Sequence, residues 1–354
     1  MTWSACTTSP SSPSLDAIAA NWRALCARHP SGPVAAVVKA DAYGLGAADV
    51  VPRLLAEGCR HVFVAHLSEA EALRPRVPHG VLLAVLDSLT PGSEAVFLEH
   101  GIVPVLSDLG QVDLWAAAAR RVERRLPALL HIDTGMNRLG LPAAEVDVLA
   151  ADPGRLAGIT LHYVMTHFVS SEVPDDPLNA LQARRFAAAC ARLPPAPRSL
   201  ANSSGIFLGA TGASDLARPG AALYGINPRP GGANPLNCVV SLDAPILQLR
   251  EIATGESVGY NATWRASRPS RIATVAAGYA DGYLRALSGR GVAILRGRSV
   301  PIVPEVEVGA TLRLLGPELP PDAVAEAAGT NAYEILTSLR QRYDRRHGPV
   351  RPLG

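Results

Sequence analysis

Residues 35–47 read AAVVKADAYGLGA, an apolar run that ends at a lysine and passes into a glycine-rich turn. A short, continuous apolar run of this kind is typical of a strand that is buried on both faces of a parallel sheet. Lys39 is the only lysine among the 354 residues, and the other 32 basic residues are all arginine. Arginine stays protonated at physiological pH, whereas a lysine amine can lose its proton, bond to a carbonyl group and act as a base. Lys39 is therefore the first candidate for a catalytic residue, with an ordinary surface lysine as the alternative.

Similar apolar runs recur along the chain, and stretches with helical periodicity separate them. Eight strands are expected, at residues 34–38, 61–65, 81–86, 102–106, 128–133, 159–164, 199–202 and 216–224. Helices are expected at residues 14–29, 47–57, 68–75, 92–100, 108–120, 143–150 and 177–192, with a helical turn near 205–210. The helix at 68–75 is expected to open with a capping box made by Ser68 and Glu71. This alternation predicts an α/β fold with a TIM-type (β/α)8 barrel, although an open doubly wound sheet would show the same pattern.

The pattern changes after about residue 236, where strand-like runs are separated by glycine and proline. These runs are CVVSLDAPILQL (238–249), RIATVAAG (271–278), GVAILRG (291–297) and SVPIV (299–303). They predict a mainly β second domain, closed by a helix at about 333–344. We therefore expect three parts: a disordered tail at 1–13, the barrel at 14–235 and the mainly β domain at 236–354.

Composition excludes several classes of protein. The chain is 48% hydrophobic and 18% charged with a net charge of +2, which gives no basic surface for nucleic acid. No apolar stretch approaches the roughly 20 residues of a membrane-spanning helix, and the N-terminus lacks the features of a secretory signal. The five cysteines are widely spaced without a CxxC pair, so we expect reduced thiols, a cytoplasmic protein and no metal site.

Residues with reactive side chains follow several of the predicted strands. In a TIM barrel the chemistry lies at the carboxyl ends of the strands, and phosphate sites commonly lie after strands seven and eight. The candidates at these ends are Lys39, Asp133, Thr134, Arg138, Thr166, His167, Asn202, Ser203, Ser204, Arg218 and Gly220. Each has an ordinary structural explanation when taken alone. Their convergence on one rim predicts a single active site.

The same segments resemble those of fold-type III pyridoxal phosphate (PLP) enzymes and, among these, the alanine racemase family. AVVKADAYGLGA (36–47) is similar to the PLP-lysine motif of the family, and HIDTGMNRLG (131–140) to its barrel-loop motif. Further similar segments follow in the order of the family: THFVSSEVPDDPLNALQARRF (166–186), LANSSG (200–205), ARPGAALYGINP (217–228), VGYNATWRA (258–266), VAAGYADGYLR (275–285) and AAGTNAYEILTSLRQRY (327–343). The resemblance covers nearly the whole chain from residue 14 onward.

The resemblance implies an enzyme that interconverts L- and D-alanine, supplying D-alanine for peptidoglycan. Two bases would act on opposite faces of the substrate α-carbon: Lys39, which also holds PLP, on the D side, and Tyr260 of the partner subunit in a homodimer on the L side. Arg218 would face the pyridine nitrogen, and His167 would connect Arg218 to Tyr260 through hydrogen bonds. Other cofactor contacts would come from Tyr43, Asn202, Ser203, Gly220, Ala221 and Tyr333. Arg138 would contact the substrate carboxylate, and Tyr279 would line the entrance.

The sequence departs from the family pattern at three places. His131 stands where the family often has a carbamylated lysine, so Arg138 would be held by a chloride ion, by Asp133 or by another carboxylate. Ser199 stands where the family often has histidine, with a small expected effect. After Val303 a segment similar to GRVSMD is missing, and in the family this segment forms one wall of the substrate pocket. The missing wall leaves open a PLP-binding homologue with lost or altered racemase activity, such as a cofactor carrier or a racemase for another amino acid. A fold-type III amino-acid decarboxylase is a third interpretation.

Overall fold

A computed structural model describes residues 10–11, 13–300, 310–339 and 343–348. The chain divides into two compact units, one formed by Ile18–Leu236 and the other by Met1–Ala17 together with Asn237–Gly354. Each unit is described by itself. Among the described residues, no helix is both long and apolar enough to cross a membrane.

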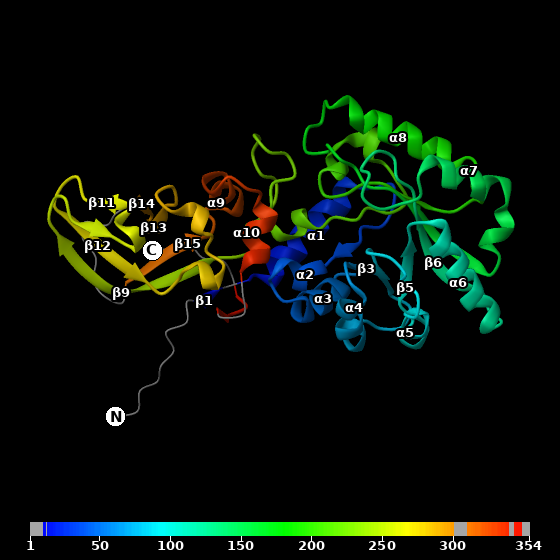
Figure 1. Cartoon of the computed structure of the whole chain (residues 1–354), viewed down its shortest axis with the longest axis horizontal. Coiled ribbons are helices and arrows are strands. Elements are labelled where there is room, and N and C mark those ends of the chain that lie inside the picture. The colour runs from blue at the N-terminus through cyan, green and yellow to red at the C-terminus, as the bar shows by residue number, and fades with distance from the viewer. Residues whose placement is uncertain (1–9, 12, 301–309, 340–342, 349–354) are drawn as a thin grey trace. The chain divides into compact units, whose positions relative to one another are not determined.

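The unit at Ile18–Leu236 is built on parallel strands that pair in the order of the chain (Figure 1). These strands are β2 (Ala36–Val37), β3 (His61–Val64), β4 (Leu82–Val85), β5 (Val103–Leu106), β6 (Leu126–His131), β7 (Ile159–Met165) and β8 (Arg198–Ser199). An eighth segment closes the sheet, because Leu216 bridges to Ser199 of β8 and Ala217 bridges to Val34, just before β2. The backbone N–H of Ala35 donates to the Ala217 carbonyl at 2.8 Å across this seam. The predicted TIM-type barrel is thus confirmed.

Helices alternate with the strands, as the sequence predicts. They are α1 (Leu15–Arg28), α3 (Ala47–Ala56), α4 (Leu67–Leu73), α5 (Glu94–His100), α6 (Leu109–Arg121), α7 (Ala143–Ala151) and α8 (Pro177–Cys190). In α1 the residues Ile18, Trp22 and Leu25 share one face and are buried, which is the spacing that produces an apolar stripe on a helix. The Trp22 indole N–H also donates to the Val34 carbonyl at 3.1 Å, so this helix is fixed beside the barrel seam.

Apolar side chains fill the barrel. Its central cluster contains Ala35, Val37, Phe63, Ala84, Val103, Val105, Leu129, Met165 and Leu216. A barrel of eight strands is wide enough to be filled by side chains but not to form a pore. Functional side chains are therefore expected at the ends of the strands, where this packing stops.

Two local predictions in the barrel are wrong. Helix α4 begins after His66, and Glu69 accepts the His66 backbone N–H at 3.0 Å, so Ser68 and Glu71 do not form the capping box. His66 has the extended backbone that an N-cap residue needs, which places the start of the helix earlier than the serine suggested. The run at 216–224 is also not one strand, because Ala221–Tyr224 forms a short 3-10 helix, η5.

The other unit is mainly β, as predicted. Its strands are β1 (Pro10–Ser11), β9 (Leu242–Ile252), β10 (Ser257–Val258), β11 (Trp264–Arg265), β12 (Ser270–Val275), β13 (Ala293–Leu295), β14 (Arg298–Val300), β15 (Thr311–Leu315) and β16 (Asp344–Arg345). The long strand β9 pairs antiparallel with β1, β12 and β15, so it organises the sheet. Two helices, α9 (Pro321–Ala328) and α10 (Ala332–Ser338), follow β15.

Three sequence expectations concern the ends and the gap of this unit. Strand β1 lies within the segment 1–13, which the sequence predicted to be disordered, and Pro10 and Ser11 pair there with β16. The helix expected at 333–344 ends at Ser338, and Asp344–Arg345 is a strand. The position after Val303, where the GRVSMD-like segment is missing, lies among residues 301–309 and outside the described residues.

Candidate functional site

The chain makes a left-handed helical turn directly after Lys39. Ala40, Asp41, Ala42 and Tyr43 have φ values of 54°, 54°, 53° and 57°. An L-amino acid in this conformation costs about 1–2 kcal/mol, and none of the four is glycine. Hydrogen bonds hold the turn: the Ala42 N–H donates to the Val38 carbonyl and the Gly44 N–H to the Ala40 carbonyl, both at 2.8 Å. Strained backbone of this kind persists where the surrounding structure fixes it, and it clusters at functional sites.

A cavity of about 300 Å³ lies at the carboxyl ends of the barrel strands. Ten of the predicted site residues line it: Lys39, Tyr43, Arg138, His167, Asn202, Ser203, Ser204, Arg218, Gly220 and Ala221. Residues that the sequence did not single out also line it: Ala65, Leu86, Asp87, Leu139, Glu172, Ile226, Asn227 and Pro228 among them. The structure therefore brings most of the predicted site residues of the barrel unit into one cavity, whereas Asp133, Thr134 and Thr166 do not line it.

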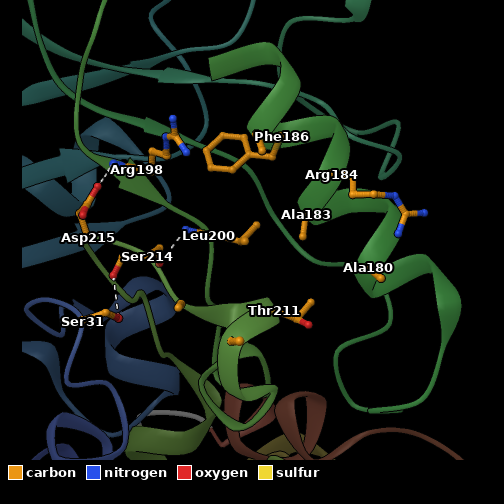
Figure 2. A pocket seen from close by; sticks show the side chains of 13 residues that line it. Ser31, Ala180, Ala183, Arg184, Phe186, Arg198, Leu200, Thr211, Ser214 and Asp215 are labelled. Carbon is orange, nitrogen blue, oxygen red and sulfur yellow. Dashed lines mark hydrogen bonds between the residues drawn. The ribbon is translucent and has the colours of Figure 1, made fainter. Parts of the chain in front are cut away.

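A larger cavity of about 710 Å³ lies elsewhere on the barrel (Figure 2). It is found where strands begin, because Arg198 opens β8 and Asp215 directly precedes the eighth segment. The Asp215 carboxylate accepts the Arg198 backbone N–H at 2.7 Å, and the Ser31 hydroxyl donates to the Ser214 carbonyl at 3.1 Å. None of the predicted site residues lines this cavity. Since barrel enzymes place their chemistry at the opposite ends of the strands, the smaller cavity is the candidate active site.

One corner of the candidate site is suited to an anion with several oxygens. The Ser203 hydroxyl oxygen accepts the backbone N–H groups of Gly220 and Ala222, each at 3.1 Å. A Cβ on Gly220 would lie 2.3 Å from the Tyr43 hydroxyl oxygen, so only glycine leaves room for that hydroxyl. The Tyr43 ring packs on the Tyr224 ring with centroids 4.6 Å apart. The hydroxyls of Tyr43 and Ser203 thus meet beside the backbone of Gly220 in one tight corner.

Arg218 brings a buried positive charge into the same cavity. The residue is 4% exposed, and its guanidinium donates to the Ser199 hydroxyl and, at 2.5 Å, to the Thr166 carbonyl. Across the described part of the chain, no carboxylate forms an ion pair with it. Burial lowers the pKa of Arg218 to about 9. A buried guanidinium with two neutral partners and further N–H groups is suited to a hydrogen-bond acceptor bound in the cavity.

The hydrogen bond expected between His167 and Arg218 is not formed. Arg218 instead uses Ser199 and Thr166, which lie on the neighbouring strand ends. Burial, followed by the charges of Arg218 and Arg138, lowers the pKa of His167 well below its ordinary value. This environment favours the neutral form of His167.

Asp133 builds the loop that carries Arg138. Its carboxylate accepts the backbone N–H groups of Gly135 and Met136 at 2.9 Å and that of Asn137 at 3.0 Å. Arg138 itself is exposed, and it forms no ion pair with any described residue. Asp133 was one of the carboxylates expected to hold Arg138. Its carboxylate instead accepts hydrogen bonds from the backbone of its own loop.

The environment of Lys39 favours a neutral amine. Burial lowers the pKa of Lys39, the charge of Arg138 lowers it further, and the carboxylate of Glu69 opposes this shift. A lysine with a lowered pKa is a better base near neutral pH than an ordinary surface lysine. This environment argues against the alternative interpretation of Lys39 as an ordinary surface lysine.

The three predicted tyrosines of the second half of the chain belong to the other unit. Tyr260 opens a short 3-10 helix, η6 (Tyr260–Ala262), and this residue is 86% exposed. Tyr279 opens η7 (Tyr279–Asp281) and is 67% exposed, whereas Tyr333 lies in α10. The two exposed rings are not used for packing within their own unit.

The acid stability of the barrel is expected to depend on His131. Burial, followed by the charge of Arg218, lowers the pKa of His131 from 6.5 to about 4, and its Nδ1 has no hydrogen-bond partner. Because the unfolded chain binds a proton near pH 6.5 and the folded chain does not, the free energy of unfolding should fall as the pH drops from 6.5 towards 4. The loss approaches roughly 1.4 kcal/mol per pH unit for this one group. Urea unfolding of the wild-type protein and of His131→Gln at several pH values tests this, and equal pH slopes for the two would contradict it.

Comparison with known proteins identifies the family. Residues 14–228 match the sequence profile of the alanine racemase N-terminal domain, and residues 239–347 match that of the C-terminal domain. The alanine racemase of Acidiphilium cryptum is 51% identical over 344 residues, which cover 93% of this chain and 96% of that protein. The alanine racemase of Rhodospirillum rubrum is 50% identical over 355 residues, covering 95% of each chain.

Solved structures give the same result. The crystal structure of alanine racemase from Bartonella henselae with covalently bound PLP matches with a TM-score of 0.93 at 35% identity, covering 96% of this chain and 99% of that one. Biosynthetic alanine racemase from Pseudomonas aeruginosa matches with a TM-score of 0.88 at 32% identity, covering 97% and 99%. This chain therefore belongs to the alanine racemase family.

Proposed function

We propose that this chain is a PLP-dependent alanine racemase, which interconverts L- and D-alanine and supplies D-alanine for peptidoglycan. The observation that carries the proposal is the cavity in which the sole lysine of the chain meets the buried charge of Arg218 and the donors around Gly220. The relatives match along nearly the whole chain and bear the same name, which supports the racemase interpretation and gives no support to a PLP carrier.

The residues of the cavity fit PLP. An amine is available at Lys39 for covalent attachment, and the corner of Tyr43, Ser203 and Gly220 offers donors to a phosphate group. The close approach of Gly220 to the Tyr43 hydroxyl is needed for this corner. When bound, PLP supplies an aldehyde carbon that bonds to amines and a ring that stabilises negative charge at the α-carbon.

Protein side chains would then move the proton. Lys39 would take the α-proton from the D side and return it there, which its lowered pKa favours. Tyr260 would do the same on the L side, because one side chain cannot easily reach both faces of a flat carbon. Arg218 would stand opposite the ring nitrogen and, being charged, would keep that nitrogen unprotonated. His167, Asn202, Ala221 and Tyr333 would complete the cofactor contacts, whereas Arg138 and Tyr279 would serve the substrate.

We also propose that the chain works as a homodimer in the cytoplasm. The exposure of Tyr260 and Tyr279 supports the dimer, since each ring is available to a site that a second copy provides. The four described cysteines, Cys26, Cys59, Cys190 and Cys238, are free thiols, as is usual in a reducing compartment.

Proton NMR in deuterium oxide tests the proposed function. The PLP-loaded protein is given L-alanine and D-alanine in separate tubes, and the α-hydrogen signal is followed together with the enantiomer ratio. We expect the α-hydrogen to be lost from both, with the opposite enantiomer accumulating. Loss from D-alanine alone would show that Lys39 acts without Tyr260. No loss from either, in a protein that holds PLP, would overturn the proposal.

Replacing Gly220 with alanine should weaken the retention of PLP. The new Cβ would lie 2.3 Å from the Tyr43 hydroxyl oxygen, so the tyrosine must move out of the corner. Overpacking of this kind costs about 1–3 kcal/mol, which corresponds to roughly 5- to 150-fold in affinity. The dissociation constant is measured by equilibrium dialysis. Gly232→Ala is the matched control, because its Cβ would meet its nearest neighbour at an ordinary 3.5 Å; equal affinities in the two variants would contradict the assignment.

A further inference from the structure

The carboxylate of Glu69 joins two segments of the barrel rim. Its Oε2 accepts the backbone N–H of Ala65 at 2.8 Å and that of His66 at 3.0 Å, where β3 passes into α4. Its Oε1 accepts the backbone N–H of Ala40 at 2.6 Å. Ala40 follows Lys39 directly and is the first residue of the left-handed turn.

Capping of α4 explains only part of this arrangement. A glutamate at the third helical position commonly accepts the N–H of the N-cap residue, here His66. The bond to Ala40 goes beyond capping, since it uses the other carboxylate oxygen and reaches a segment 29 positions away in the sequence.

The bond to Ala40 bears on the orientation of Lys39. The Ala40 N–H and the Lys39 carbonyl belong to the same planar peptide group. A hydrogen bond that holds this N–H therefore also fixes the orientation of the peptide group that follows the Lys39 Cα. The following turn holds four residues in a costly conformation. Without an anchor at its first residue, the turn can relax and carry the lysine side chain with it.

The same carboxylate adds a negative charge beside the lysine amine. Among the charged and titratable groups around Lys39, Arg138 stands on the loop after β6 and His167 follows β7, and the cavity is also lined by Tyr43, Asp87, His131, Glu172 and Arg218. The charge of Glu69 raises the pKa of Lys39, against burial and Arg138, which lower it. The charge of Glu69 thus opposes the charge of Arg138 in its effect on the pKa of Lys39.

We propose that Glu69 is a positioning residue for Lys39, which anchors the backbone directly after the lysine and balances the positive charge of Arg138 at its amine. The proposal rests on the proposed function, in which Lys39 is a base.

Two variants of Glu69 distinguish the anchoring of the backbone from the effect of the negative charge. Glu69→Gln removes the charge but keeps an oxygen that can accept a backbone N–H, whereas Glu69→Ala removes both. Glu71→Gln is the matched control, since Glu71 lies on the same helix, is exposed and makes none of these three hydrogen bonds.

The sole lysine makes the first test direct. The cofactor-free full chain is treated with an amine-reactive reagent over a range of pH, and modification of the peptide that contains Lys39 is quantified by mass spectrometry. The N-terminal amine is the only other amine, and it falls in another peptide. We expect the midpoint of labelling to move to lower pH in Glu69→Gln and Glu69→Ala and to stay unchanged in Glu71→Gln. Unchanged midpoints in both Glu69 variants would overturn the electrostatic part, whether or not the protein racemises alanine.

The second test asks whether the proton transfer of Lys39 has been slowed. We expect turnover to fall roughly ten- to a hundredfold in Glu69→Ala, the size of effect that misplacing a catalytic group produces, and to fall less in Glu69→Gln. The primary isotope effect with α-deuterated D-alanine should rise, and that with α-deuterated L-alanine should fall, because only the step on the D side becomes slower. Partial unfolding would lower the active fraction and leave both isotope effects unchanged. That outcome, or full turnover in Glu69→Ala, would overturn the positioning role, whereas a wild-type protein without turnover would instead overturn the proposed function.

Discussion

Lys39→Arg is expected to abolish both the covalent attachment of PLP and racemisation. Arginine keeps the positive charge and much of the length of lysine, but it stays protonated and cannot serve as a nucleophile or a base. Loss of the base alone is expected to slow the reaction by about 100- to 10,000-fold, and loss of the attachment adds to this. The environment strengthens the expectation, because burial and Arg138 favour a neutral amine that arginine cannot provide.

Reduction with borohydride followed by mass spectrometry measures the attachment. The wild-type chain should gain the mass of one reduced PLP on the peptide that contains Lys39. The variant has no lysine at all, so no other side chain can replace the attachment, and its mass should be unchanged. Thermal unfolding checks that the variant folds. Substantial racemisation by a folded Lys39→Arg protein would remove this residue from the mechanism.

Tyr260→Phe is expected to stop racemisation while leaving the fold intact. The residue is 86% exposed, so loss of its hydroxyl removes no packing from its own unit. Removing a general base typically costs about 100- to 10,000-fold. Exchange of the α-hydrogen should therefore be lost from L-alanine, whereas D-alanine should still exchange through Lys39 without changing its configuration.

The NMR assay in deuterium oxide distinguishes this result from general damage. Damage to the fold or to PLP binding would slow exchange from both enantiomers equally, and only loss of the base on the L side makes the two differ. Tyr279→Phe is a useful comparison, because this ring is also exposed but is proposed only to line the entrance. Equal exchange from both enantiomers in Tyr260→Phe would assign the L-side proton to another group.

The fold followed from the sequence because buried parallel strands leave a strong pattern. The run at residues 61–65 is continuous and apolar, and it forms β3 at His61–Val64. The eighth run, at residues 216–224, was harder to assign. Pro219 has no N–H with which to continue a strand, and Gly220 and Ala221 line the cavity. Apolar composition alone could not distinguish a strand from the short helix η5.

The candidate site was only partly predictable. Lys39, Arg218 and Gly220 carried clear signals in their residue types and in the segments around them. Ser199 did not, because serine is common in turns, yet its hydroxyl accepts from the buried Arg218 guanidinium. Its replacement of histidine was expected to have a small effect, which stays a prediction. Glu69 was overlooked because Ser68 and Glu71 matched the capping pattern two residues later. The left-handed conformation after Lys39 had no sequence signal, since none of its four residues is glycine and its first residue is held by the distant Glu69 carboxylate.

The seam that closes the barrel is also the seam that would hold the cofactor. Leu216 and Ala217 join the last part of the ring to the first, and the next residues, Arg218 and Gly220, already face the cavity. A ligand that binds only the closed ring adds its binding free energy to the stability of that ring. PLP would therefore stabilise the closed barrel as well as take part in the reaction, and the cofactor-free chain should unfold at a lower temperature than the PLP-loaded chain.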